Sequence, residues 1–296
     1  MREMATLTAG TIHLGDLRVH QVHGGHGSPV VFIHGLGSSG YMEWRFNLEP
    51  AALNHRVFAP DLPGYGRTEK PRVRYTIKYF ADFVARYMES RGLHSAAVVG
   101  ASLGGRIALE IALQHPDLVR RLVLVNALGL GRPRPQMAQM AYGLVTVPHV
   151  GEAVMRFTRS ALRWAPPRTI RRVAGRFAGS STDLEKVMDD GYLEDLREMY
   201  ETQDFHDAYL STVRSLIHPR ALMGGEHDVS ARLKELAMPV QLIWGADDPL
   251  FPVEHATRAH AVIAGSRLAV IEGAGHTPQA ERPDDFNRIL DDFLSA

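Results

Sequence analysis

Short runs of consecutive apolar residues alternate with longer segments of helical periodicity in the first 130 residues. The apolar runs PVVFI, RVFAP, AAVVG and RRLVLVN occupy residues 29–33, 56–60, 96–100 and 120–126. Runs of this length with hardly any polar position are typical of strands that are buried on both faces, as in parallel sheets covered by helices. We therefore predict a mainly parallel central sheet with helices on each side.

Two segments between these strands have the spacing of amphipathic helices. The first helical pattern covers residues 75–92 and ends at Gly92. The second begins at residue 102 and ends ahead of Pro116. Glycine and proline at these places are ordinary signals for the end of a helix. Before the sheet, residues 11–23 alternate between apolar and polar positions around a Gly-Asp pair, which predicts an antiparallel hairpin at the sheet edge.

The alternation of strands and helices stops near residue 130. Residues 131–236 contain helical segments separated by proline and glycine, and none of them has a convincing strand pattern. Strand and helix patterns then return at residues 239–245, 253–264, 267–273 and 284–294. We predict one α/β core formed by residues 1–130 and 237–296, with residues 131–236 inserted as a helical block.

Composition and charge limit the classes of partner, the chemistry of the site and the location that the sequence supports. The 296 residues include 33 basic and 33 acidic side chains, so the net charge gives no reason to expect nucleic acid or an anionic membrane as the main partner. The absence of cysteine excludes disulfides, thiolate metal sites and a cysteine nucleophile. No apolar stretch is typical of a signal peptide or a membrane span, so we expect a cytoplasmic protein without stable membrane insertion. The sequence does not indicate an oligomeric state.

The sharpest chemical signal is GASLGG at residues 100–105, between a predicted strand and a predicted helix. A sharp strand-to-helix turn of the G-x-S-x-G type exposes the serine above the sheet and requires small residues two positions to each side, here Gly100 and Gly104. Ser102 is therefore a candidate nucleophile. The alternative is a packing turn or a phosphate cradle, although the segment lacks the P-loop ending and the dinucleotide glycine spacing.

A second glycine-rich loop, HGLGSSG at residues 34–40, follows the strand PVVFI. It is either a plain turn or a loop that brings a backbone N–H group toward the serine. In the second case the N–H groups of Leu36 and Leu103 form an oxyanion hole.

Two further strand ends carry candidate residues. EGAGHTP at residues 272–278 puts His276 in a glycine-flanked loop, and WGADDP at residues 244–249 presents Asp247 and Asp248. A carboxylate could orient the imidazole there, because ligands of open α/β sheets bind beyond the carboxyl ends of the strands. A lone histidine of this kind is more often structural.

In combination, the serine, acid and histidine each follow a strand, in that order along the chain, and the chain resembles the α/β-hydrolase superfamily. The motifs that carry the resemblance are HGLG, DLPGYGRT, GASLGG, LVLVNA, WGADDPLFP and GAGHTPQAERPDDF. The resemblance implies an α/β-hydrolase fold in which the helical block is a cap. The family's run of Trp-Gly, two residues and Asp-Pro implies that Asp248 is the catalytic acid and Asp247 a surface turn residue. It also implies that Asp61, His34 and His115 serve loop structure.

The resemblance implies a serine hydrolase with the triad Ser102, His276 and Asp248, and with no metal or organic cofactor. Carboxylic esters are the leading substrates. An alternative is the carbon–carbon hydrolase branch that acts on aromatic-ring cleavage products. Its members typically carry asparagine before the nucleophile and tryptophan after the histidine, where this chain has Ala101 and Thr277. A ligand receptor without turnover on the same fold is a third interpretation.

Two charged patterns remain. His20, His23 and His26 invite a metal interpretation, but a spacing of three along a strand points neighbouring histidines to opposite faces. The helical block is rich in arginine at positions 156, 159, 163, 168, 171, 172 and 176, followed by an acidic stretch at residues 183–201. The plain interpretation is solvated faces that pair with each other. Guidance of an acidic substrate and contact with a lipid surface are the alternatives.

Overall fold

The computed structural model describes residues 5–134, 143–216 and 228–296. Its centre is an eight-stranded sheet in the order β1-β2-β4-β3-β5-β6-β7-β8. The strands are Leu7–Leu14 (β1), Leu17–Gly24 (β2), Ser28–Ile33 (β3), His55–Pro60 (β4), Ala96–Ala101 (β5), Val119–Val125 (β6), Val240–Gly245 (β7) and Arg267–Ile271 (β8). β3 to β8 pair in parallel, and β2 pairs antiparallel with both β1 and β4. The predicted parallel sheet and edge hairpin are therefore confirmed.

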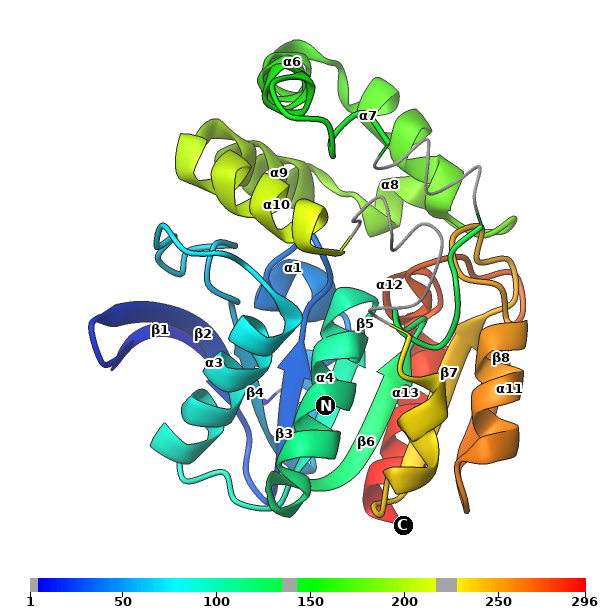
Figure 1. Ribbon diagram of the computed structural model, residues 1–296. Helices are drawn as coiled ribbons and strands as arrows, with labels where there is room; N and C mark the ends of the chain where they lie inside the picture. Colours follow the sequence, from blue (N-terminus) through cyan, green and yellow to red (C-terminus); the bar gives the residue numbers. More distant parts are fainter. Residues whose placement is uncertain (1–4, 135–142, 217–227) are drawn as a thin grey trace.

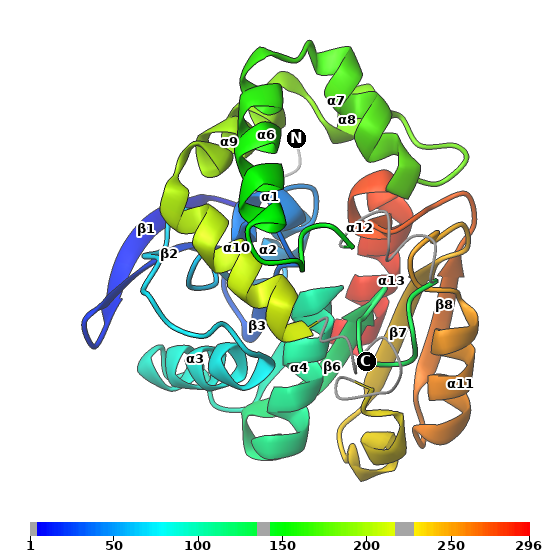
Figure 2. The same cartoon turned by 45° about the horizontal axis from the view of Figure 1, so that its top comes forward.

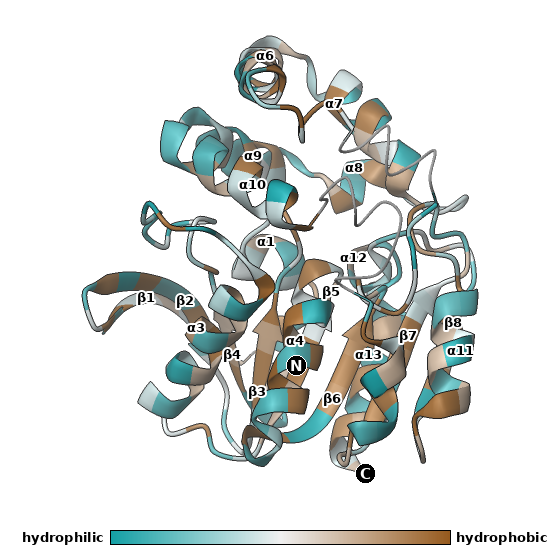
Figure 3. Cartoon of the chain, in the orientation of Figure 1, coloured by the Kyte–Doolittle hydropathy of each residue, from teal (hydrophilic) through white to brown (hydrophobic). Residues whose placement is uncertain are grey.

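Helices cover both faces of the sheet (Figure 1). The core helices are Gly40–Trp44 (α1), Leu48–Ala52 (α2), Ile77–Ser90 (α3), Leu103–Gln114 (α4), Glu254–Val262 (α11), Pro278–Glu281 (α12) and Pro283–Ser295 (α13). Phe80 of α3 and Ile107 of α4 pack in one apolar cluster with Val98, and Phe286 of α13 packs in the other with Val99. Neighbouring positions of β5 thus face opposite layers. This explains why β5 has no polar position, and Figure 3 shows the same hydrophobic colouring along β3.

The helical block lies beyond the carboxyl ends of the parallel strands (Figures 1 and 2). Its helices are Val150–Trp164 (α6), Pro167–Ala174 (α7), Leu184–Val187 (α8), Asp190–Glu201 (α9) and Gln203–Leu216 (α10). Between residues 131 and 236, the described residues contain no strand. α10 docks on the core through Tyr65, whose ring meets Phe205 edge-on and whose hydroxyl hydrogen-bonds Thr212 at 2.8 Å. That this block is a substrate cap stays a prediction.

Asp61 and His34 hold the loops that follow β4 and β3. Asp61 accepts hydrogen bonds from the backbone N–H groups of Gly40 and Arg67, both at 2.8 Å. His34 Nε2 accepts from Leu62 N–H at 2.9 Å. Asp61 also binds Nδ1 of His20 at 2.9 Å, which gives that histidine a structural partner. None of the described helices combines the length and apolar character that a membrane crossing requires.

The turn between β5 and α4 depends on a close approach to β3. A Cβ atom at Gly104 would lie 2.2 Å from the carbonyl oxygen of Ile33 and 2.6 Å from that of His34. Neither oxygen can move without disturbing β3, so only glycine fits. The helix that follows Ser102 can therefore sit directly against the central strand.

We predict that Gly104→Ala lowers the free energy of unfolding by about 2 kcal/mol or more, since overpacking against rigid backbone typically costs about 1–3 kcal/mol. Gly10→Ala is the control, because a Cβ atom there meets nothing within 4 Å. Urea denaturation of the two variants gives the comparison. Equal midpoints for Gly104→Ala and the parent protein would show that α4 is free to move away from β3.

Candidate active site

Ser102 occupies the turn between β5 and α4 in a strained conformation. Its φ of 52° and ψ of −114° lie outside the regions that side-chain-bearing residues normally adopt. The neighbouring strand holds it there, because Ser102 N–H donates to the carbonyl of Val125 at 2.9 Å and Leu128 N–H donates to the carbonyl of Ser102 at 3.0 Å. The serine is thus fixed by its surroundings rather than by its own preference.

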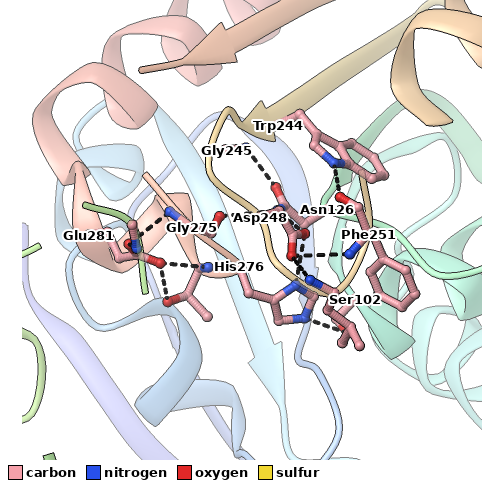
Figure 4. Close-up of polar contacts among 12 residues, drawn as sticks. Ser102, Asn126, Trp244, Gly245, Asp248, Phe251, Gly275, His276 and Glu281 are labelled. Atoms are coloured by element: carbon pink, nitrogen blue, oxygen red, sulfur yellow. Dashed lines mark hydrogen bonds and ion pairs between the residues drawn. The ribbon is translucent and has the colours of Figure 1, made fainter. Parts of the chain in front are cut away.

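Ser102, His276 and Asp248 form one hydrogen-bonded line (Figure 4). His276 Nε2 lies 3.1 Å from the Ser102 hydroxyl oxygen, and His276 Nδ1 lies 2.9 Å from a carboxylate oxygen of Asp248. Because the carboxylate only accepts, Nδ1 carries the proton and Nε2 accepts from the serine. The structure leaves Asp247 outside this line: its exposed carboxylate accepts from the backbone and hydroxyl of Ser180 at 2.9 and 2.6 Å.

The Asp248 carboxylate is buried and fully engaged. Only 2% of the residue is exposed. One oxygen accepts from Leu250 N–H at 2.8 Å and Phe251 N–H at 3.1 Å. Burial by itself raises the pKa of Asp248, but the nearby His276 and these N–H groups outweigh it, so that the pKa is lowered. Asp248 therefore stays ionised beside the imidazole.

Asn126 is a site residue that the sequence analysis missed. The pattern placed it inside a strand, whereas β6 ends at Val125 and Asn126 has a φ of 41°. Its amide donates to Asp248 at 2.5 Å and to the carbonyl of Gly275 at 3.1 Å, and its oxygen accepts from Gly245 N–H at 3.0 Å. One buried side chain thus joins the ends of β6 and β7 to the histidine loop. A polar residue that closes an apolar run was the available signal.

Glu281 is a second residue that the sequence analysis missed. One of its oxygens accepts from Gly275 N–H at 2.8 Å, and the other accepts from the N–H and hydroxyl of Thr277 at 2.9 and 3.0 Å. These hydrogen bonds fix the position of the backbone on both sides of His276. Glu281 lies within the motif GAGHTPQAERPDDF, but neither its residue type nor its spacing from His276 indicated a role.

The helical block also reaches the histidine loop. His276 N–H donates to the carbonyl of Phe177 at 2.8 Å, and Gly179 N–H donates to Glu281 at 2.7 Å. A Cβ atom at Gly275 would lie 2.4 Å from the nitrogen of Gly179, so the two segments meet backbone to backbone. The position of His276 therefore depends on both the core and the helical block.

Burial and charge act in opposite directions on His276. Burial lowers the pKa of its imidazole, but the charge of Asp248 and the hydrogen bond to it raise it more, and Glu43 and Glu281 add to the rise. The net pKa is above the ordinary value of 6.5. The environment thus favours an imidazole that accepts a proton, which is what a general base beside a hydroxyl needs.

The loop after β3 passes against the serine. A Cβ atom at Gly35 would lie 3.4 Å from Cβ of Ser102. Leu36 follows in this loop, and Leu103 is the first residue of α4, whose first-turn N–H groups have no partner within the helix. An oxyanion hole formed by the N–H groups of Leu36 and Leu103 remains a prediction.

A carboxylate that the sequence analysis did not consider lies near the same loop. The Cβ position at Gly35 is also 3.7 Å from a carboxylate oxygen of Glu43. The amide of Gln279 donates to the other oxygen at 2.6 Å and holds it in place. A negative charge thus lies close to the nucleophile. It comes from α1, a short helix without a recognisable motif.

Comparison with known proteins identifies the family to which this fold belongs. The family model described as alpha/beta hydrolase fold matches residues 28–283. An uncharacterized protein of Mycobacterium tuberculosis is 32% identical over 292 residues, which cover 98% of this chain and 81% of the relative. The 2-hydroxy-6-oxo-2,4-heptadienoate hydrolase of Pseudomonas putida is 29% identical, with 95% and 93% coverage. A solved meta-cleavage product hydrolase of Pseudomonas fluorescens IP01 is 26% identical, with 94% coverage of each chain and a TM-score of 0.74.

We predict that His276 titrates above pH 6.5 in Ser102→Ala protein and at a lower pH when Asp248→Asn is added. The second change removes the charge and the hydrogen bond that raise the pKa most, while burial, which disfavours the imidazolium, stays. NMR titration of the histidine ring measures both values, with His276→Gln to assign the signal. The same midpoint in both proteins would contradict the role given to Asp248.

In the parent protein, kcat/KM should accordingly fall as the pH drops through the raised pKa, since only neutral imidazole accepts the serine proton.

Proposed function

This chain belongs to the α/β-hydrolase family, and on that premise we propose that it is a serine hydrolase that cleaves carboxylic esters through an acyl-enzyme. The observation that carries the proposal is the line from Ser102 through His276 to Asp248, with distances of 3.1 and 2.9 Å. A hydroxyl, a base and an orienting carboxylate in this order constitute the machinery of nucleophilic acyl transfer.

In the proposed reaction, His276 Nε2 takes the hydroxyl proton of Ser102 while the serine oxygen attacks the ester carbonyl. Asp248 stabilises the imidazolium, and the N–H groups of Leu36 and Leu103 stabilise the oxyanion. The imidazolium then returns the proton to the departing alcohol, which leaves an acyl group on Ser102. Water repeats the sequence from the same side, releases the acid and restores the serine. The raised pKa of His276 suits the first of these proton transfers.

Carbon–carbon bond hydrolysis is the second candidate, because several relatives carry such names. Besides the Pseudomonas putida enzyme, a 2-hydroxymuconate semialdehyde hydrolase of Pseudomonas sp. is 28% identical, with 94% and 91% coverage. Two features favour the ester. Ala101 and Thr277 stand where that branch typically carries asparagine and tryptophan. The Glu43 carboxylate would also repel the carboxylate of a dienoate brought to Ser102.

We predict that Ser102→Ala folds normally and loses turnover by on the order of 10³-fold or more, since a broken triad retains only binding and oxyanion stabilisation. Asp248→Asn should lose roughly 10⁴-fold, because the amide lets the imidazole adopt the wrong tautomer. Asp247→Asn is the control, since its side chain accepts from Ser180 outside the line. Steady-state kcat on a p-nitrophenyl ester ranks the variants. The reverse order for the two aspartates would move the acid to Asp247, and a single turnover in the parent protein would indicate a receptor.

The second prediction separates the two substrates. The parent protein should cleave neutral p-nitrophenyl esters with a higher kcat/KM than a ring-cleavage dienoate. Glu43→Gln should raise kcat/KM for the dienoate on the order of tenfold relative to that for the neutral ester, because the like-charge repulsion concerns only the dienoate, whereas the contribution of Glu43 to the pKa of His276 affects both substrates. Glu49→Gln makes the same charge change at an exposed site and serves as the matched control. A dienoate preference in the parent protein would establish the carbon–carbon hydrolase instead.

A further inference from the structure

The two outermost helices of the helical block expose large apolar side chains. Phe157 and Trp164 of α6 are 75% and 78% exposed, and Val173 of α7 is 55% exposed. Val150, Phe157 and Trp164 are seven residues apart, so they lie on one side of α6. The opposite side of the helix buries Met155. α6 therefore presents apolar side chains both to the interior of the protein and to solvent.

Arginines surround these side chains in a stretch of the sequence that has no acidic residue. Residues 153–182 contain no aspartate or glutamate, although the whole chain has 33 acidic and 33 basic side chains. Arg159 and Arg171 reach out of this stretch to pair with Glu201 and Asp190. Five other arginines are exposed and make no ion pair within the described part of the chain, namely Arg156, Arg163, Arg168, Arg172 and Arg176. Together with Val150, Phe157, Trp164 and Val173 they form what we call the outer face.

The outer face occupies one end of the molecule. α6 and α7 lie farthest from the sheet in Figure 1, and no other described element stands beyond them in that view. In Figure 2, where the top of Figure 1 comes forward, α7 lies at the upper edge and α6 runs down across the middle. A large flat surface could therefore meet both helices without contacting the core.

We propose that the outer face docks on an anionic lipid bilayer. Guanidinium groups bind phosphate oxygens in pairs of hydrogen bonds, and tryptophan and phenylalanine insert at the level of the headgroups. Arg163 stacks over the ring of Trp164 at 5.5 Å, so the cation and the aromatic group approach the same boundary. The arrangement of exposed aromatic residues beside unpaired arginines fits a membrane surface and needs no helix that crosses it.

The positive charge of the outer face argues against the alternative partner for this surface, a second copy of this chain. A twofold contact through the outer face would place the same five arginines against one another. Residues 153–182 supply no carboxylate to offset that repulsion. An anionic surface meets the same arginines with the opposite charge. The docking uses residues outside the proposed catalytic line, so it stands or falls independently of ester hydrolysis.

The chain carries its own reporter for this interaction. It has three tryptophans, of which Trp44 and Trp244 are fully buried and Trp164 is exposed. Vesicles of brominated lipid should quench Trp164 fluorescence when they contain equal parts of phosphatidylglycerol and phosphatidylcholine, but not when they contain phosphatidylcholine alone. Binding should weaken as salt rises, because the attraction is screened.

We expect Arg168→Gln, Arg172→Gln and Arg176→Gln together to weaken binding on the order of 100-fold, since each arginine near an anionic surface contributes about fivefold. The charge-matched control combines Arg86→Gln, Arg258→Gln and Arg288→Gln, three exposed positions elsewhere. Phe157→Ser with Trp164→Ser should weaken binding as well, measured by vesicle sedimentation, and leave the thermal unfolding midpoint unchanged.

Three results would overturn the proposal. The first is no vesicle binding, or equal binding to neutral and anionic vesicles. The second is an equal loss in the two triple variants, which would indicate only a general charge effect. The third is a dimer in sedimentation velocity that Phe157→Ser and Trp164→Ser convert to monomers, which would make the outer face a subunit interface.

Discussion

The buried charge of Asp248 is the constraint on which the site depends. An ionised carboxylate away from water is strongly destabilising unless hydrogen bonds compensate it. Its partners come from three segments: Leu250 and Phe251 after β7, Asn126 after β6, and His276 after β8. Each of these segments must take one position to satisfy the charge. The carboxylate therefore arranges the loops, and the loops in turn fix the imidazole.

A second carboxylate extends this arrangement to the helical block. Glu281 accepts from Gly275 and Thr277 beside His276, and from Gly179 in the chain that leads out of α7. The carbonyl of Phe177 adds a direct bond to His276 N–H. A displacement of residues 177–179 would remove hydrogen bonds from the histidine loop. The geometry of His276 is in this way coupled to the segment between α7 and α8 in the helical block.

Local patterns predicted much of this from the sequence. A stretch of about ten residues is enough to recognise each strand, the turn around Ser102 and the loops with Asp248 and His276. This is because each functional side chain directly follows its own strand. Asn126 was missed because its contact with Asp248 joins residues 122 positions apart. Glu281 also has a distant contact, with Gly179 102 positions away, while its bonds to Gly275 and Thr277 are local but follow no pattern that the sequence analysis used. The two aspartates were separated by family resemblance alone. In the structure, Asp248 is buried beside His276 while Asp247 faces Ser180.

The distribution of charge links the site to the surface. Equal numbers of acidic and basic residues give a neutral chain, yet the carboxylates of Asp248, Glu43 and Glu281 all raise the pKa of His276. Positive charge without local compensation is found instead on α6 and α7. An anion would thus be repelled near Ser102 and attracted at the outer face. A neutral acyl substrate is insensitive to the first effect. If both proposals hold, this separation allows one chain to bind an anionic surface and still favour an uncharged substrate.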